Sequence, residues 1–208
     1  MIAASQERWS EFWKRLGANN DPLPCWHKLR ASYSESWRAY HNLNHISHCL
    51  TEFDNAKELV VNPNAVETAI WFHDAIYNTR QKDNEERSAD LADEFLAGAG
   101  ISKGFRQSVR ELILVTKHNQ TPSDSDASLL VDVDLSILGQ TPELYAEFEE
   151  NIRQEYAWVS PADFAAGSSG VLQSFLNRES IFNSEPFRRK YEPQARVNLA
   201  WAIKRLAI

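Results

Sequence analysis

The sequence predicts an all-α protein, and two observations carry that prediction. Only seven glycines occur among 208 residues, and runs of alternating β-branched residues, which are typical of strands, are scarce. Apolar residues recur instead with the period of a helix. Beginning at Asn64, five residues are spaced so that they fall on one face of a helix: Val66, Ala69, Ile70, His73 and Tyr77.

Start and stop signals place the helices that follow. The segment 84–98 is rich in Glu, Ala and Leu and is expected to form a helix that stops at a glycine. Ser102 is a candidate N-cap for the next helix. The polar segment 120–127 has no apolar period and is expected to be a loop.

Helices are also expected in the last third of the chain. Thr141 and Ser160 each stand directly before a proline, a combination that favours a helix start. It predicts one helix from 142 to about 158 and another from 161 onward. A last helix is expected over about 192–206, which gives roughly ten helices around one core.

Length and charge narrow the class of protein. With 208 residues, 43% of them hydrophobic and 25% charged, the chain can form one domain with a substantial core. The net charge of −7 argues against binding a long nucleic acid, whereas a short anionic substrate stays compatible because a local field can oppose the net charge. We expect a single domain over 1–208, with unknown oligomeric state.

The location of the protein is predicted from three features. No stretch reaches the roughly 18 apolar residues of a membrane span, and the N-terminus shows no signal-peptide pattern. The two cysteines, Cys25 and Cys49, form no CxxC pair, which fits a reducing compartment. We therefore expect a cytoplasmic protein that does not bind membranes.

Three of the six histidines lie close together in the sequence. If a helix begins near Asn42 or Asn44, either residue can cap it, and His45 lies in its first turn. His45 and His48 are then an i, i+3 pair on one face. His41 would precede this helix.

The adjacent pair His73-Asp74 is a second candidate for metal binding. Neighbouring side chains on a helix project about 100° apart, so an ion between them can take a ligand from each. His73 also ends an apolar stripe, so its ring should point into the core at the C-terminal end of the helix. A hydrogen-bonded core histidine is the alternative for His73 taken alone.

A third candidate is the pair Asp132 and Asp134 within the apolar run 129–139. Burying an unpaired carboxylate costs several kcal/mol or more, and a cation would remove that cost. Each aspartate could instead cap the following helix. Imidazole and carboxylate together suit Zn, Mn, Fe, Co or Ni, whereas Mg is favoured where oxygen ligands dominate.

The ordered set His45, His73-Asp74 and Asp134 resembles the signature of the HD superfamily of metal-dependent phosphohydrolases. The similarity covers roughly residue 37 to the C-terminus, and helices within 1–36 are expected to pack on that core. One departure is Ser168, where the family pattern has Arg after the Gly. Six segments resemble a subgroup of predicted HD phosphohydrolases of about this length: YHNLNHI (40–46), WFHDAIY (71–77), NEERSA (84–89), DVDLSILG (132–139), IRQEY (152–156) and ARVNL (195–199).

The resemblance implies an all-α, single-domain HD-type helical bundle in which His45, His73, Asp74 and Asp134 bind one divalent ion. The metal would be Mn, Mg, Fe, Co, Ni or Zn. Asp134 is preferred to Asp132 because DxD forms of the superfamily use the second aspartate, and Asp132 then orients a ligand or caps a helix. Asp74 counts as a catalytic residue as well. The implied activity is hydrolysis of a nucleotide or other small phosphoester by a metal-activated water.

Other residues receive candidate roles in that reaction. His118, at the end of a predicted helix, is the first candidate to hold phosphate oxygens, and it could instead complete a second metal site. Glu85 or Glu86 would orient water or give a proton to the leaving group, or else cap a helix. Lys117 would assist at the phosphate or be solvated, and His41 would reach the rim of the site.

Two other classes of function remain open. An iron-dependent oxygenase of HD type would need further ligands, which His41, His48 and His118 could supply. A non-enzymatic, ligand-sensing helical module would have kept the fold without turnover. Residues assigned structural rather than catalytic roles are Arg153, Arg196, Tyr156 and Asn198, and those assigned to the core are Trp9, Phe12 and Trp13.

Overall fold

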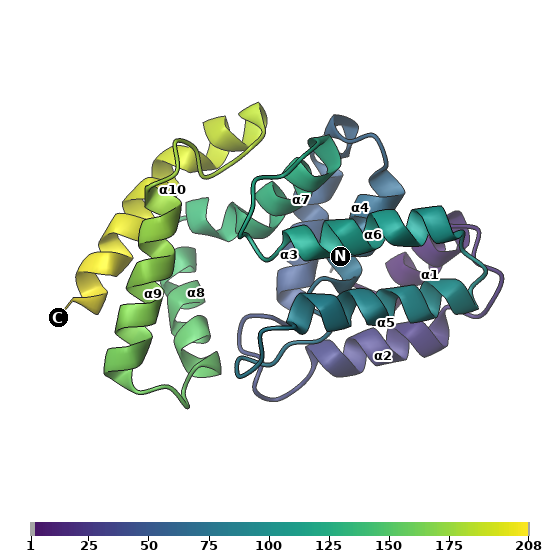
Figure 1. Cartoon of the computed structure of the whole chain (residues 1–208), viewed down its shortest axis with the longest axis horizontal. Helices are drawn as coiled ribbons and strands as arrows, with labels where there is room; N and C mark the ends of the chain where they lie inside the picture. Colours follow the sequence, from purple (N-terminus) through teal and green to yellow (C-terminus); the bar gives the residue numbers. More distant parts are fainter. Residues whose placement is uncertain (1–2, 208) are drawn as a thin grey trace. The chain divides into compact units, whose positions relative to one another are not determined.

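A computed structural model describes residues 3–207, and every regular element in that range is a helix, which confirms the predicted all-α class (Figure 1). The α-helices are α1 (Gln6–Arg15), α2 (Leu23–Tyr33), α3 (Leu43–Asp54), α4 (Pro63–Phe72), α5 (Asn84–Gly98), α6 (Lys103–Val115), α7 (Ser125–Leu135), α8 (Pro142–Glu155), α9 (Pro161–Leu176) and α10 (Glu185–Leu206). Two short 3₁₀ helices are η1 (Lys57–Leu59) and η2 (Ser136–Gly139).

The chain groups into two compact units, Met1–Leu130 and Val131–Ile208, which we describe separately. The first unit holds α1 to α6 and the start of α7. The second holds the end of α7, η2 and α8 to α10. The prediction of one domain over 1–208 stays a prediction.

Aromatic side chains form the core of the first unit. Trp9, Phe12 and Trp13 lie on one face of α1 and are buried, as predicted. The Trp9 ring meets the Trp71 ring of α4 edge-on, with centroids 5.4 Å apart, and Trp26 of α2 approaches Trp71 at 6.2 Å. Burial of such large apolar surfaces is the main source of stability here, and it fixes α4 against α1 and α2.

Helix α3 begins where its cap predicts. Asn42 has an extended backbone, and its side-chain oxygen accepts a hydrogen bond from the Asn44 amide at 2.8 Å. Of the two predicted caps, Asn42 is therefore the one used. His45 lies in the first turn and is buried, as expected.

Helix α4 ends at Phe72, earlier than its apolar stripe predicts, so that Tyr77 lies beyond the helix. The His73 amide still donates to the Ala69 carbonyl at 2.8 Å. Side chains satisfy the carbonyl groups at this end: the Tyr33 hydroxyl donates to Trp71 and the Arg38 guanidinium donates to Asp74. These bonds replace further helical ones and stop the helix.

Helices α5 and α6 pack side by side; α5 spans the predicted range 84–98, and α6 follows its predicted cap. Ser102 accepts from the Phe105 amide at 3.4 Å and so caps α6. Ion pairs join the two helices at Arg106–Asp93 and Arg110–Asp90.

Helix α10 begins at Glu185, well before the predicted residue 192, and it contains Pro193 in its interior. The start is marked by Ser184 and Pro186. The predicted start was too late because Pro193 lies inside the helix, and proline usually ends a helix. Helix α8 ends at Glu155, slightly earlier than predicted.

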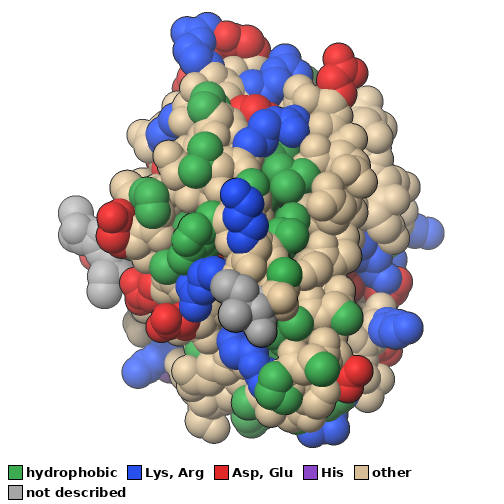
Figure 2. Space-filling view, turned by 90° about the vertical axis from the view of Figure 1, so that its left-hand side faces the viewer, with side chains coloured by type: hydrophobic (Ala, Val, Ile, Leu, Met, Phe, Trp, Pro, Cys, Tyr) green, Lys and Arg blue, Asp and Glu red, His purple; other side chains and the backbone are tan. Residues whose placement is uncertain are grey.

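Two features of the second unit concern its packing and its surface. A Cβ on Gly139 would lie 2.5 Å from the Tyr191 Cβ, so only glycine allows η2 to approach α10 so closely. The face formed by α9 and α10, which Figure 2 turns toward the viewer, shows apolar side chains among Lys and Arg. Large apolar residues exposed on these helices include Val171, Val197 and Trp201.

Candidate metal centre

Three predicted ligands converge in the first unit. The Nε2 atoms of His45 and His73 lie 3.1 Å apart. The Asp74 Oδ2 atom lies 3.0 Å from the His73 Nε2 and 3.4 Å from the His45 Nε2. Both histidines are buried, while the Asp74 side chain keeps 18% of its surface exposed. Of the three side chains, that of Asp74 is therefore the most accessible to solvent.

The spacing of these atoms fits a divalent ion. Ligand atoms about 2.1 Å from one metal lie about 3.0 Å apart on an octahedron and about 3.4 Å apart on a tetrahedron. The three observed separations fall within that range. The His73 Nδ1 lies 3.0 Å from the Ile70 carbonyl oxygen, which can only accept, so Nδ1 donates there; once the proton on Nε2 is lost, the Nε2 lone pair is available to a ligand. These side chains could hold a metal ion.

The electrostatics of the group centre on Asp74. Burial by itself would raise the pKa of this carboxyl. The charges of His73 and His41, and hydrogen bonds from His45 and His73, outweigh burial and hold the pKa well below its ordinary value. Asp74 is therefore an ionised carboxylate at neutral pH, which is the form that binds a cation.

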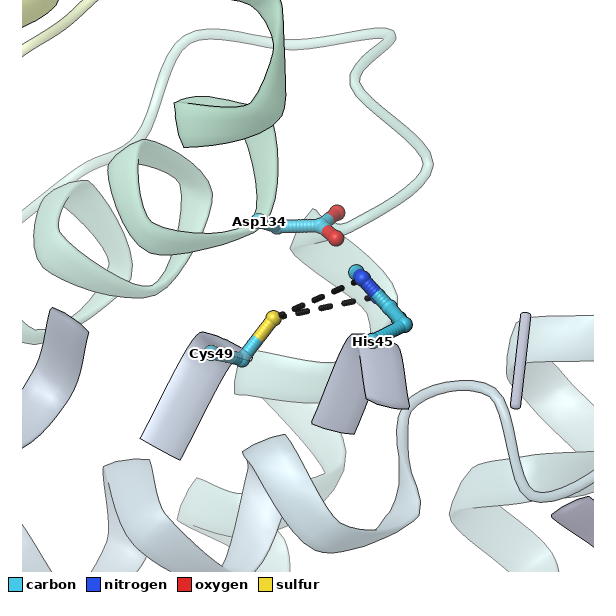
Figure 3. A group of neighbouring side chains, drawn as sticks. All are labelled: His45, Cys49 and Asp134. Atoms are coloured by element: carbon cyan, nitrogen blue, oxygen red, sulfur yellow. Dashed lines mark hydrogen bonds between the residues drawn. The ribbon is translucent and has the colours of Figure 1, made fainter. Parts of the chain in front are cut away.

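The cysteine Cys49 adjoins this group and was missed from the sequence. Its Sγ lies 3.7 Å from the His45 Nδ1 and 3.8 Å from the His45 Nε2, one helical turn along α3 (Figure 3). Both side chains are buried. Its i, i+4 spacing from His45 could have identified it, whereas the pair predicted from the sequence was His45 with His48 at i, i+3.

Two further aromatic side chains, Tyr40 and His41, lie beside the buried His45 ring. The His41 ring stacks on the Tyr77 ring with centroids 4.1 Å apart and planes 25° from parallel. The His41 and Tyr40 rings approach the His45 ring at 5.8 and 4.9 Å. His41 thus lies beside the candidate ligands, in the region predicted from its position before α3.

The first turn of α5 is attached to the segment that follows Asp74. The Ser88 hydroxyl bonds both the amide and the carbonyl of Ile76, at 3.0 and 3.3 Å. The Asn84 side chain accepts from the Asn78 amide at 3.0 Å. This attachment fixes the helix start that carries Glu85.

Lys117 forms an ion pair, and its assistance at a phosphate stays a prediction. Its Nζ lies 2.5 Å from Glu86 and 4.0 Å from Glu85. The hydrogen bond from Lys117 lowers the pKa of Glu86, and the same bond raises the pKa of Lys117. The pair joins the end of α6 to the start of α5.

His118 follows this lysine in the turn after α6. Among residues 3–207 it is the non-glycine residue with left-handed backbone, with φ of 54°. Its amide donates to the Val115 carbonyl at 3.2 Å. Such a conformation is uncommon for a side-chain-bearing residue and often marks a functional turn. The phosphate-binding role of His118 and the catalytic role of Glu85 stay predictions.

Of the two aspartates of α7 that the sequence offers as ligands, Asp132 is held by hydrogen bonds. Asp132 is fully buried, and its carboxylate accepts four hydrogen bonds from Asn183 and Ser184, at 2.6 to 2.9 Å, just before α10. Burial raises its pKa, while these bonds act in the opposite direction. These hydrogen bonds therefore offset part of the cost of burying Asp132. Asp134 lies in the same helix, and its role as a ligand stays a prediction.

Residues assigned structural roles make structural contacts in the second unit. Arg153 donates to the carbonyl oxygen of Tyr156 at 2.7 Å. Arg196 donates to three main-chain carbonyls at and just after the end of α9, and the Asn198 amide donates to two carbonyls near η2. Ser168, the departure from the family pattern, is half-buried in α9.

Compared with known proteins, the chain matches no family model, no curated protein and no solved structure. Within residues 3–207, none of the helices combines the length and the apolar character that crossing a membrane requires. The candidate function is therefore inferred from the side chains of the candidate metal centre.

Proposed function

We propose that the protein is a metal-dependent phosphohydrolase acting on a nucleotide or another small phosphoester. The observation that supports this most strongly is the convergence of His45, His73 and Asp74, whose ligand atoms lie 3.0 to 3.4 Å apart. Asp134 completes the proposed ligand set on the strength of the sequence pattern.

A divalent ion bound by these residues would supply a Lewis acid and an activated water for attack on phosphorus. The chain supplies the rest. The Ile70 carbonyl fixes the orientation of the His73 ring, and the depressed pKa of Asp74 keeps a negative charge at the site. Catalytic zinc sites typically have three protein ligands and leave a further position for water or substrate.

Substrate contacts are proposed for residues near the exposed side of the site. His41, held by its stack on Tyr77, is in reach of a ligand that approaches Asp74. Glu85 belongs to the helix turn that is bonded to the segment after Asp74, so it is the proposed proton-transfer residue. His118 is the proposed phosphate-binding residue.

The test is a panel of nucleotides and simple phosphoesters with Mn, Co, Ni, Mg or Zn, with phosphate release as readout. Turnover that depends on metal, and that His73→Ala abolishes, supports the proposal. Asp90→Ala is the matched control, because Asp90 forms an exposed ion pair with Arg110 away from the candidate ligands. Absence of turnover across the panel, or turnover by metal-free His73→Ala protein, would overturn it.

A further inference from the structure

Arg38 connects the two chain segments that carry the candidate metal ligands. Its side chain is completely buried, and its Nε forms an ion pair with Glu35 at 2.8 Å. One terminal nitrogen, Nη1, donates to the carbonyl oxygens of His41 at 3.1 Å and Asp74 at 2.6 Å. The other, Nη2, donates to the carbonyl oxygen of Ala75 at 3.2 Å.

Two aromatic rings restrict the guanidinium further. Its central carbon lies 5.3 Å from the centroid of Tyr33 and 5.5 Å from the centroid of Tyr77. A planar guanidinium suits stacking and forked donation, and a lysine ammonium at the same place would reproduce neither. The Arg38 side chain therefore has one arrangement in which all its partners are satisfied.

The acceptors of Arg38 belong to the parts of the backbone that set the ligand positions. His41 directly precedes Asn42, the cap of the helix whose first turn carries His45. Asp74 and Ala75 follow the end of α4, where His73 and Asp74 leave the helix. Arg38 thus bonds the entry to one ligand-bearing helix and the exit from the other.

We infer that Arg38 is a positioning residue of the metal centre, which holds His45 at its observed distance from His73 and Asp74. The inference rests on the proposed metal-dependent function. Arg38 itself offers no ligand atom to a cation, because a guanidinium carries only donors. Its effect is transmitted through the three carbonyl groups, and partners behind metal ligands typically change affinity about 10- to 100-fold.

The chain contains a matched control for this residue. Arg196 in the second unit also bonds one carboxylate, that of Glu192, and three main-chain carbonyl groups. Replacing either arginine by lysine removes the same kinds of bond. Only Arg38→Lys changes the segments that carry His45, His73 and Asp74.

The experiment compares Arg38→Lys, Arg196→Lys and the unaltered protein in a titration with Co²⁺, followed by visible absorption. Arg38→Lys is expected to bind Co²⁺ about 10- to 100-fold more weakly and to shift the d–d bands, because the ligand atoms no longer hold their spacing. Arg196→Lys is expected to keep affinity and spectrum while losing thermal stability. Amide hydrogen exchange should rise at residues 41–45 and 73–77 in Arg38→Lys alone, even without metal.

A second variant covers the case in which Arg38→Lys does not fold. Glu35→Ala removes only the partner of the Arg38 Nε, and Glu35 keeps 33% of its side chain exposed. A loss of two- to about fivefold in Co²⁺ affinity is expected, the scale of a partly exposed ion pair. Unchanged affinity in Glu35→Ala would then count against the role of Arg38.

The outcomes separate this inference from the proposed function. If the unaltered protein binds no Co²⁺, both fail. If it binds Co²⁺ and Arg38→Lys keeps the original affinity, spectrum and exchange, the positioning role fails while the metal centre stands. Equal losses in Arg38→Lys and Arg196→Lys would likewise reject it. A selective loss in Arg38→Lys, in a protein that hydrolyses no phosphoester, supports the positioning role and rejects the phosphohydrolase.

Discussion

The His45 and His73 Nε2 atoms lie 3.1 Å apart, with the Asp74 carboxylate in contact with both rings. Two protonated imidazoles cannot share this spacing without strong repulsion. A cation bound between the nitrogens would use the lone pairs that protons otherwise occupy. Protons and metal are thus competitors at this site.

Metal affinity is therefore expected to fall as pH is lowered from 7.5 to 5.5, and binding at neutral pH should release protons. Asp74 contributes little to that change, because its pKa is already far below this interval. Titration calorimetry in buffers with different ionisation enthalpies measures the number of protons released. An affinity that stays constant across this pH interval would contradict the competition.

Removing one ligand should remove the metal and spare the fold. His73→Ala and Asp74→Ala are each expected to weaken metal binding by at least about 100-fold, more than the loss of an outer partner costs. Metal content after dialysis and far-UV circular dichroism measure the two properties. Asp90→Ala, a surface change on α5, serves as control and should keep both. Full metal content in His73→Ala would show that the ion binds elsewhere.

Asp132 should contribute strongly to stability. Asp132→Asn replaces one acceptor oxygen by a donor that faces the Asn183 and Ser184 donors, so we expect a loss of about 3 kcal/mol in the free energy of unfolding. Urea denaturation measures it. Asp163→Ala, at an exposed helix start, should cost far less. Similar losses in the two variants would argue against the role of Asp132 in holding the start of α10.

Glu149 should make the stability of the folded state depend on pH with a sign opposite to that of a carboxylate in an ordinary ion pair. Burial raises its pKa, while the Tyr145 hydroxyl at 2.7 Å and the charge of Arg205 act in the opposite direction. The folded state thus holds the Glu149 proton more tightly than the unfolded state, and stability falls as pH rises from about the ordinary glutamate value of 4.3 through the raised pKa.

Glu149→Gln carries no titrating group and can still accept from Tyr145. As the pH rises from 4 to 7, the free energy of unfolding of the variant should therefore increase relative to that of the unaltered protein. Chemical denaturation of both proteins at pH 4 and pH 7 measures this difference. The contributions of the other titrating groups are the same in both proteins and cancel. A difference that does not vary with pH would contradict the assignment.

The thiol of Cys25 should be inert in the folded protein. Burial raises the pKa of this thiol well above its ordinary value, so almost no thiolate forms at pH 8. Labelling by an aromatic disulfide reagent should require unfolding. Ser123→Cys introduces a thiol in the exposed segment before α7 and should react at once under the same conditions. Rapid labelling of Cys25 in the native protein would refute the burial described here.

Helix starts could be predicted from the sequence, because a capping side chain acts over three or four residues. Asn42, Ser102 and Ser160 cap helices as expected. The end of α4 could not be predicted, since it depends on Tyr33 and Arg38, which are distant in sequence from Trp71 and Asp74. The start of α10 was hidden by Pro193, which the long helix tolerates.

Only part of the candidate site could be predicted from the sequence. Adjacency in the sequence identified His73-Asp74, and motif order brought in His45. The fourfold hydrogen bonding of Asp132 was not foreseeable, because its partners lie 51 and 52 residues away. The role of Arg38 could not be predicted, because the bonds that link it to the ligand-bearing segments are to backbone carbonyl groups, which every residue type carries.

The distribution of tryptophan between the two units has an optical consequence. Trp9, Trp13 and Trp71 are fully buried in the first unit, whereas Trp158 and Trp201 of the second are 48% and 40% exposed, and Trp37 of the first is 56% exposed. Buried indoles emit at shorter wavelengths than hydrated ones, so the blue edge of the fluorescence spectrum reports mainly on the first unit. Because Trp71 lies two residues before His73, a paramagnetic ion bound there should quench this blue emission.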